Sequence, residues 1–329
     1  NNDLAYLSKA DYIWVNGNIG ASLTTPTKSY RSVFTSIGGA TERNFDGDLT
    51  RAAIQAYYGM EFLNYWNLRT FWIHEEPALD DRLTRGGPVV KRTGYDFGHF
   101  QVSTDARSPA VFDVELEGSK GIGGGSRTFS FAPGVALKPT SNIFIQLSPT
   151  FEYNEGVAQY VTSVADPTAS AFFGSRYVFA AIRTRTVSIS TRLNWTFTPT
   201  LTLQLFAQPF VASGDYSSFR EFAAPRTLAK RIYGVDMGTI EYRGEDDRYL
   251  VDPDGIGPAR PFSFGDPDFT SGALRGTAVL RWEYRPGSTL FFVWTQQRSS
   301  DDPASGFSYD RARSAIFDQR PVNIFQVKL

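Results

Sequence analysis

The side chains of this 329-residue chain that could do chemistry are carboxylates and arginines at alternate positions of extended segments. Asp113, Glu115 and Glu117 occupy every second position, so an extended chain places all three on one face. Further charges with the same inward placement follow later in the chain: Arg192, Arg281 and Glu283. Such residues could line a water-filled pore, where the acidic stripe would favour cations. In a closed interior they would instead form ion pairs across strands.

A second group of charges surrounds a Gly-Gly-Pro sequence in the segment EEPALDDRLTRGGPVVKR (75–92). Asp80, Asp81, Arg82 and Arg85 belong to it. As a loop at the mouth of a pore, this segment could fold inward and constrict the lumen, with its two arginines paired to inward carboxylates. The alternative is a solvated loop whose local salt bridges contribute little to stability.

The segment VDPDGIGPARPFSFGDPDF (251–269) carries four carboxylates: Asp252, Asp254, Asp266 and Asp268. Alternate Asp residues with Gly resemble half of a calcium loop, because Ca²⁺ binds several carboxylate and carbonyl oxygens. The segment lacks the glutamate that ends an EF-hand loop, and Asp-Pro and Asp-Gly pairs are also ordinary turn sequences. Calcium at these four residues is therefore one of two interpretations, and no other cofactor is expected.

The sequence gives little support for catalysis. Cysteine is absent, and the only histidines are His74 and His99. The segment GSKGIGGGS (118–126) is not followed by a helix that could cradle a phosphate. We therefore expect no enzyme, with an outer-membrane hydrolase that uses a serine and one of the two histidines as an alternative. The net charge of -1 gives no electrostatic reason to expect nucleic acid as a partner.

The elements that must position these residues have a two-residue period, which predicts β-strands. In VSISTRLNWTFTPTLTLQLFAQPF (187–210), apolar and polar side chains alternate on both sides of a Thr-Pro-Thr turn. About 13 segments of this kind follow one another: 12–23, 32–41, 49–63, 67–74, 95–104, 110–119, 128–137, 142–153, 177–197, 201–213, 274–284, 289–297 and 322–329. No amphipathic helix is expected, and there is no run of 18 apolar residues to form a transmembrane helix.

Short turns and long polar connections alternate between these segments. The longest expected loops lie near 75–93, 154–176, 214–270 and 299–320. Aromatic residues flank the short turns, as in the interfacial girdle of an outer-membrane barrel. These features predict an all-β fold, namely an antiparallel transmembrane β-barrel with its apolar face toward the lipid bilayer and extracellular long loops. The alternative is a large soluble β-protein whose apolar face meets a second sheet.

Two details qualify this prediction. Pro133, Pro149 and Pro209 lie within strands, where proline cannot donate to the hydrogen-bond ladder, so bulges or local ladder breaks are expected. If the last strand ends in the periplasm, an odd strand count makes the first strand start outside the cell. The whole chain, 1–329, is therefore expected to be the C-terminal part of a larger barrel.

Several segments resemble a bacterial family of unknown function. They are NNDLAYLSKAD (1–11), NFDGDL (44–49), LDDRLTRGGP (79–88), STDARS (103–108), AQYVT (158–162), RLNWTFTPTLTLQLFAQPFVASGDYSSFRE (192–221), VDPDG (251–255), FSFGDPDF (262–269) and LRWEYRPGSTLFFVW (280–294). In that family a carbohydrate-binding-module-like domain precedes a C-terminal outer-membrane barrel. The resemblance implies location and architecture, and it implies a glycan role only by kinship.

The expected function is a pore, gated conduit or membrane anchor in the bacterial outer membrane, with a link to glycan binding or uptake implied by the resemblance. The alternative is a plugged barrel that serves as a surface scaffold for a glycan or for an outer-membrane or periplasmic protein partner. A hydrolase is the less favoured third interpretation.

Overall fold

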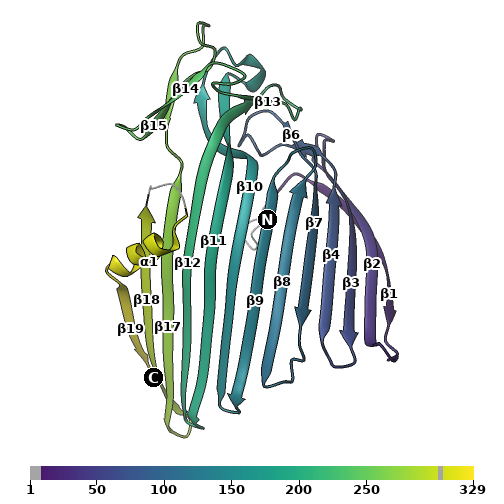
Figure 1. Cartoon of the computed structure of the whole chain (residues 1–329), viewed down its shortest axis with the longest axis vertical. Coiled ribbons are helices and arrows are strands. Elements are labelled where there is room, and N and C mark those ends of the chain that lie inside the picture. Colours follow the sequence, from purple (N-terminus) through teal and green to yellow (C-terminus); the bar gives the residue numbers. More distant parts are fainter. Residues whose placement is uncertain (1–8, 303–306) are drawn as a thin grey trace.

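The computed structural model describes residues 9–302 and 307–329, and one long antiparallel sheet organises them (Figure 1). Thirteen strands neighbour one another along the described part of this sheet. In spatial order they are β1 (Ile13–Leu23), β2 (Tyr30–Arg43), β3 (Leu49–Phe62), β4 (Asn67–Glu75), β7 (Tyr95–Ser103), β8 (Ala110–Gly121), β9 (Arg127–Thr140), β10 (Ile143–Ala165), β11 (Ser175–Thr198), β12 (Leu201–Phe222), β17 (Phe269–Arg285), β18 (Ser288–Asp302) and β19 (Val322–Lys328). Each of the 13 predicted strands is found. Most of the sequence segment 1–11 lies outside the described residues.

The connections divide the sheet into two edges, which we call the turn edge and the loop edge. Figure 1 shows tight turns along the lower edge and larger connections along the upper edge. The predicted contrast in length is only partly right, because the loop-edge connections 44–48 and 122–126 are as short as the turns at 24–29 and 104–109.

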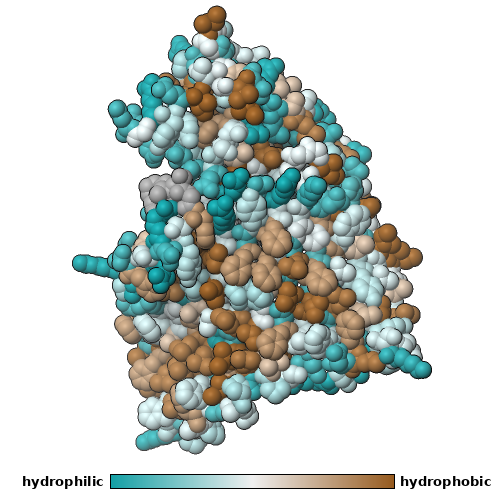
Figure 2. Space-filling model, in the orientation of Figure 1, coloured by the Kyte–Doolittle hydropathy of each residue, from teal (hydrophilic) through white to brown (hydrophobic). Residues whose placement is uncertain are grey.

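The sheet has one apolar and one polar face. The register between β11 and β12 pairs Leu193 with Leu205 on one face and Asn194 with Gln204 on the other. The apolar face is exposed along the whole path of strands, and each strand contributes at least one exposed large side chain to it: Ile19, Ile37, Ile54, Trp72, Phe100, Phe112, Phe129, Phe151, Trp195, Leu205, Trp282, Trp294 and Phe325. Apolar side chains gather over the lower part of the face seen in Figure 2.

The buried apolar clusters of the described residues lie near the loop edge rather than between layers of the sheet. One joins Val178, Ala180 and Phe219 of the long strands to Val251 and Phe264 of a small sheet. That small sheet consists of β14 (Thr239–Arg243), β15 (Arg248–Asp252) and β16 (Phe262–Gly265), and a further strand, β13 (Lys230–Ile232), pairs with β12. Toward the turn edge, no second described sheet covers either face.

Several loop predictions need correction. The loop expected at 154–176 is mostly strand, because β10 and β11 extend to Ala165 and from Ser175 and leave a connection with the 3₁₀ turn η1 (Ser170–Phe172). The tract 214–270 begins with nine more residues of β12 and contains the small sheet. In these extensions residues on both faces of a strand are buried, as with Val178, Phe179 and Ala180, so the two-residue period disappears from the sequence.

The expectation that no helix would occur is wrong. α1 (Tyr309–Asp318) begins at Ser308, whose side chain accepts a hydrogen bond from the Arg311 amide. Ala312 and Ile316, one turn apart, pack on Val211 of the apolar face. Two buried positions in ten residues are too weak a periodic signal for sequence reasoning. No helix among the described residues is long and apolar enough to cross a membrane.

The three strand prolines interrupt the ladder without changing its register. Between β9 and β10 the paired residues stop at Leu147–Val135 and resume at Phe151–Phe131, so that Pro133 and Pro149 fall in the same gap. Between β11 and β12 the corresponding gap contains Pro209. The predicted ladder breaks are confirmed, and no bulge accompanies them.

The sheet of described residues does not close on itself. β1 pairs only with β2, β19 pairs only with β18, and every residue of both strands is exposed. In an antiparallel path of 13 strands the first and last run in the same direction, here from the loop edge to the turn edge. Direct pairing of β1 with β19 would therefore be parallel, unlike every other pair in the path.

Candidate functional site

The candidate site is the polar face together with the connections that fold over it. Following the register across the sheet places all six predicted pore-lining charges on this face. They are distributed over three strands: Asp113, Glu115 and Glu117 on β8, Arg192 on β11, and Arg281 and Glu283 on β17. The structure thus brings them to one surface but not into one network.

The acidic stripe of β8 lies apart from the arginines of this group. Arg281 pairs with its own strand neighbour Glu283 at 3.4 Å, and the Arg192 guanidinium lies 5.6 Å from the centre of the Phe206 ring. β9 and β10 separate Arg192 from the acidic stripe of β8. Among the described residues no lysine or arginine forms an ion pair with that stripe, so the interpretation of cross-strand neutralisation does not apply to it.

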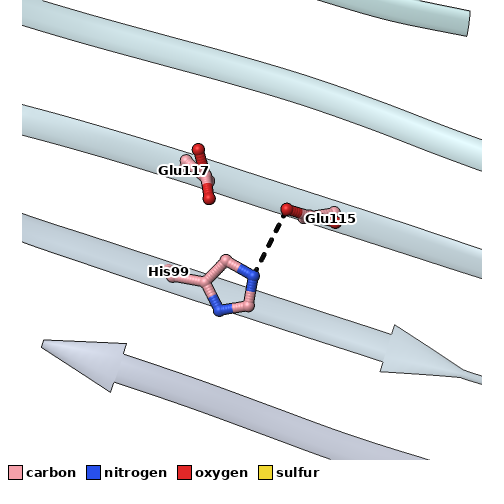
Figure 3. A group of neighbouring side chains, drawn as sticks. All are labelled: His99, Glu115 and Glu117. Atoms are coloured by element: carbon pink, nitrogen blue, oxygen red, sulfur yellow. Dashed lines mark ion pairs between the residues drawn. The ribbon is translucent and has the colours of Figure 1, made fainter. Parts of the chain in front are cut away.

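A histidine completes the acidic stripe. His99 of β7 is the cross-strand partner of Glu117 and lies diagonally from Glu115. Its Nε2 atom is 3.4 Å from a Glu115 carboxylate oxygen, and one ligand atom from each of the three residues lies within 4.8 Å of the others (Figure 3). No other described trio of histidine, aspartate or glutamate side chains meets this criterion, so this is the place on the polar face where a metal ion could be held.

The segment after β4 folds over the polar face as a small hairpin, β5 (Ala78–Asp80) with β6 (Val90–Arg92). Its base is fixed by Glu75, whose side chain is only 2 % exposed. The Glu75 carboxylate pairs with Arg51 at 2.9 Å and with Arg92, and it accepts a hydrogen bond from the Tyr95 hydroxyl at 3.1 Å. Three partners for one buried carboxylate hold the hairpin rigidly at β3, β4 and β7.

The far end of the hairpin reaches strands that are not its neighbours in the sheet. Val90 is fully buried against Phe179 of β11 and Phe222 of β12. The Arg85 guanidinium lies 4.2 Å from the centre of the Tyr160 ring on β10. The hairpin thus crosses over β8 and β9, as the inward-folding interpretation requires.

The predicted partners of the hairpin charges are only partly right. Arg85 contacts an aromatic ring rather than an inward carboxylate. Arg82 lies 3.7 Å from its neighbour Asp81 and donates to the backbone oxygen of Ala10 at 2.7 Å. Asp80 accepts hydrogen bonds from the amides of Arg82 and Leu83. Asp80 therefore shapes the turn, and Asp81 accepts a hydrogen bond from the Asn44 side chain. The Glu75 contacts hold the base of the hairpin, and burial of Val90 holds its far end.

A second connection crosses the same opening. Residues 223–229, which we call the strap, leave the end of β12 and meet the hairpin through two backbone hydrogen bonds, Arg226 N–H to Val89 and Lys91 N–H to Thr227. The Arg226 guanidinium then donates to both carboxylate oxygens of Asp48, at 2.7 and 3.0 Å, on the connection between β2 and β3. This contact holds the pKa of Asp48 below its usual range.

The strap shows that the polar face is concave. Seven strand-to-strand steps separate β3 from β12, an arc of roughly 34 Å at about 4.8 Å per step. The four Cα–Cα steps from Phe222 to Arg226 span at most about 14 Å. One arginine side chain completes the distance to Asp48. The sheet must therefore curve around its polar face, with the strap as a chord across the opening.

A cavity of about 410 Å³ lies beneath the hairpin. Asp80 and Lys91 of the hairpin line its upper side, and Phe97, Ser119 and Asn154 of the polar face line the rest. A volume of this size is in the range of small-molecule sites, and its lining mixes aliphatic, aromatic and polar groups.

Three of the four aspartates proposed for calcium bind backbone amides of their own turns. Asp252 accepts from the Gly255 amide, Asp254 from the Ala259 amide and Asp266 from the Asp268 amide. Asp268 accepts from the Tyr216 amide at 2.6 Å. Asp252, Asp254 and Asp266 thus act as ordinary turn residues, whereas Asp268 ties its segment to β12.

Sequence reasoning missed His99, Glu75 and the pair Asp48–Arg226. His99 could have been found, because aligning 95–104 with 110–119 across their short turn puts it opposite Glu115, on the same face as its actual cross-strand partner Glu117. No signal pointed to the Asp48–Arg226 contact, whose partners are 178 residues apart in the chain.

Comparison with known proteins gives a family but no described activity. A family model described as a domain of unknown function (DUF5916) matches residues 1–238, well over half of the chain. This region contains β1 to β12, the hairpin, the acidic stripe and the strap. The family description mentions neither a carbohydrate-binding domain nor a membrane. No curated protein and no solved structure matches the chain significantly. The chain therefore belongs to the DUF5916 family, whose function is unknown.

Proposed function

We propose that the chain forms most of the wall of an antiparallel β-barrel in the bacterial outer membrane and that this barrel is a gated conduit. The observation that carries the proposal is the apolar face, which stays exposed on all 13 strands while the other face is polar and concave. Soluble monomers rarely expose apolar patches larger than a few hundred Å². Lipid would cover this face, and water would fill the concave side.

The turn edge supports the same orientation. Trp66, Trp195, Phe197, Trp282 and Tyr284 are exposed beside the turns at this edge. Trp195 and Phe197 have ring centres 4.3 Å apart, and those of Trp282 and Tyr284 are 6.0 Å apart. Amphipathic rings in such a row suit the boundary between lipid and water, and the turn edge would be periplasmic.

Closure of the proposed barrel needs further strands. Because β1 and β19 run in the same direction, only an odd number of added strands can pair antiparallel with both. Such strands would also cover the unpaired backbone groups of β1 and β19, which hydrocarbon cannot hydrogen-bond.

The hairpin and the strap favour a conduit that is closed at rest. Both cross the opening at the loop edge, and they are linked to each other and to Asp48. The competing interpretation, a plugged barrel that anchors a partner, rests on the same crossing. The two differ in whether the hairpin can be removed to leave an open lumen.

Planar bilayer recordings on the full protein separate them. The comparison is between the unchanged protein and a variant in which a Gly-Ser linker replaces residues 79–92. We expect stepwise ion currents that are small or rare in the unchanged protein and large in the variant. Absence of current from both proteins, with normal heat-modifiable folding, would contradict the conduit and favour the plugged anchor.

A further inference from the structure

The negative charge of the trio His99, Glu115 and Glu117 has no lysine or arginine partner among the described residues. Elsewhere near the loop edge, carboxylates have cationic partners, as Glu75 has in Arg51 and Arg92. Among the described residues Glu117 has no hydrogen-bond or ion-pair partner, and His99 is the only ion-pair partner of Glu115. Asp113, two positions along the same strand, adds a third carboxylate. Like charges so close together favour a bound cation.

The fixed geometry of the sheet makes the trio convergent. His99 and Glu117 are directly opposed on neighbouring strands, and Glu115, two residues from Glu117 along β8, is on the same face. A metal ion with ligand bonds of about 2.1 Å spans at most about 4.2 Å between two opposite ligand atoms. The three ligand atoms already lie within 4.8 Å of one another, so small side-chain rotations would bring them onto one ion. Figure 3 shows the imidazole and both carboxylates on the same side of the two strands.

The second histidine of the chain shows what a non-binding arrangement looks like. His74 also has two carboxylates beside it, but its Nδ1 atom is 2.9 Å from Asp96 and its Nε2 atom is 3.4 Å from Glu76. Both ring nitrogens are engaged, on opposite edges of the ring, so the carboxylates cannot share one ion with the imidazole. At His99 only Nε2 has a carboxylate neighbour within ion-pair distance.

From this geometry we propose that His99, Glu115 and Glu117 bind one divalent transition-metal ion, with Zn²⁺ as the representative. One imidazole nitrogen and two carboxylate oxygens suit Zn²⁺, Mn²⁺ or Fe²⁺ and do not suit Ca²⁺, which takes oxygen ligands alone. Three protein ligands leave at least one coordination position for water or for a passing ligand. The proposal concerns binding to the wall itself and does not depend on the conduit.

The test is metal binding by the full protein in detergent, with Co²⁺ and Zn²⁺ as probes. Visible absorption of Co²⁺ reports nitrogen and oxygen coordination, and Zn²⁺ displacement of Co²⁺ gives relative affinity. The variants are His99→Ala and Glu117→Gln, and His74→Ala is the matched control. We expect one Co²⁺ per chain in the unchanged protein and in the control, and at least about tenfold weaker binding in the two site variants.

Two results would overturn the proposal. One is a Co²⁺ spectrum and affinity in Glu117→Gln equal to those of the unchanged protein. The other is loss of binding in His74→Ala alone. If His99→Ala fails to fold by heat-modifiable mobility, Glu117→Gln decides the matter, because it keeps the size of the side chain.

Discussion

At the scale of single residues, the ion pair between Arg226 and Asp48 joins the strap to the opposite side of the loop edge. Arg226 holds the pKa of Asp48 below its usual range by hydrogen bonding to the charged form. A carboxyl group whose pKa is lowered in the folded state adds stability at pH values above its ordinary pKa of about 3.9. That contribution is lost as the pH falls through the lowered pKa.

The first prediction follows because the charged form of Asp48 stabilises the folded state at neutral pH. Asp48→Asn should release the strap at pH 7, where the unchanged protein keeps the contact, and it should reproduce there the loosening that the unchanged protein shows only in strong acid. The measurement is hydrogen–deuterium exchange of the peptide covering 223–229, which should speed up severalfold. Asp46→Asn, an exposed neighbour, is the control. Equal exchange in both variants would show that the contact does not hold the strap.

At the scale of elements, each strand has to satisfy two different surroundings. Leu205 lies on the apolar face, farther from the turn edge than Trp195, and its neighbour Gln204 lies on the polar face. On the proposed lipid-facing side, an arginine near the bilayer midplane costs about 2–4 kcal/mol. On the water-filled side the same charge keeps its hydration.

The second prediction is therefore a difference between adjacent positions. Leu205→Arg should lower the free energy of unfolding by about 2–4 kcal/mol in lipid vesicles, and Gln204→Arg by less than about 1 kcal/mol. Urea titration of tryptophan fluorescence measures both. Equal losses at the two positions would mean that the faces do not meet lipid and water.

How well sequence predicts these elements depends on what surrounds them. Where a strand has one apolar and one polar face, as in β1 to β4 and β7 to β9, alternation predicted its ends to within about three residues. Where the strands extend into the loop edge, burial on both sides around Phe179 removed the signal. The hairpin β5–β6 and the small sheet are three to five residues per strand, too short for any periodic pattern.

The candidate site likewise has parts that the sequence predicts and parts that it does not. The face of Asp113, Glu115 and Glu117 was predictable, because strand geometry alone decides it. The imidazole of His99 required the register between two strands, and the partner of Arg85 required the path of a loop. Contacts made by connections depend on packing across the opening, which leaves no pattern in the local sequence.

At the scale of the whole molecule, the third prediction is that tryptophans on the two faces of the sheet contact different surroundings. Trp72 is 41 % exposed on the apolar face, and Trp14 is 48 % exposed on the opposite face, where it pairs across the strands with Glu42. Although the two side chains are similarly exposed, Trp72 should contact lipid and Trp14 should contact water. In single-tryptophan variants, lipids brominated on their acyl chains should quench Trp72 strongly and Trp14 weakly. Equal quenching would contradict the proposed wall.

The strap also bears on how the molecule is made. Asp48 and Arg226 are separated by 178 residues and by the whole arc from β3 to β12, so their contact forms only after that arc has curved. Contacts of such long sequence separation are slow to form, because loop-closure entropy is lost before they contribute. We therefore expect the Asp48–Arg226 ion pair to form late in folding. A folding intermediate that precedes this step would have paired strands, but its strap would not yet be joined to Asp48 at the loop edge.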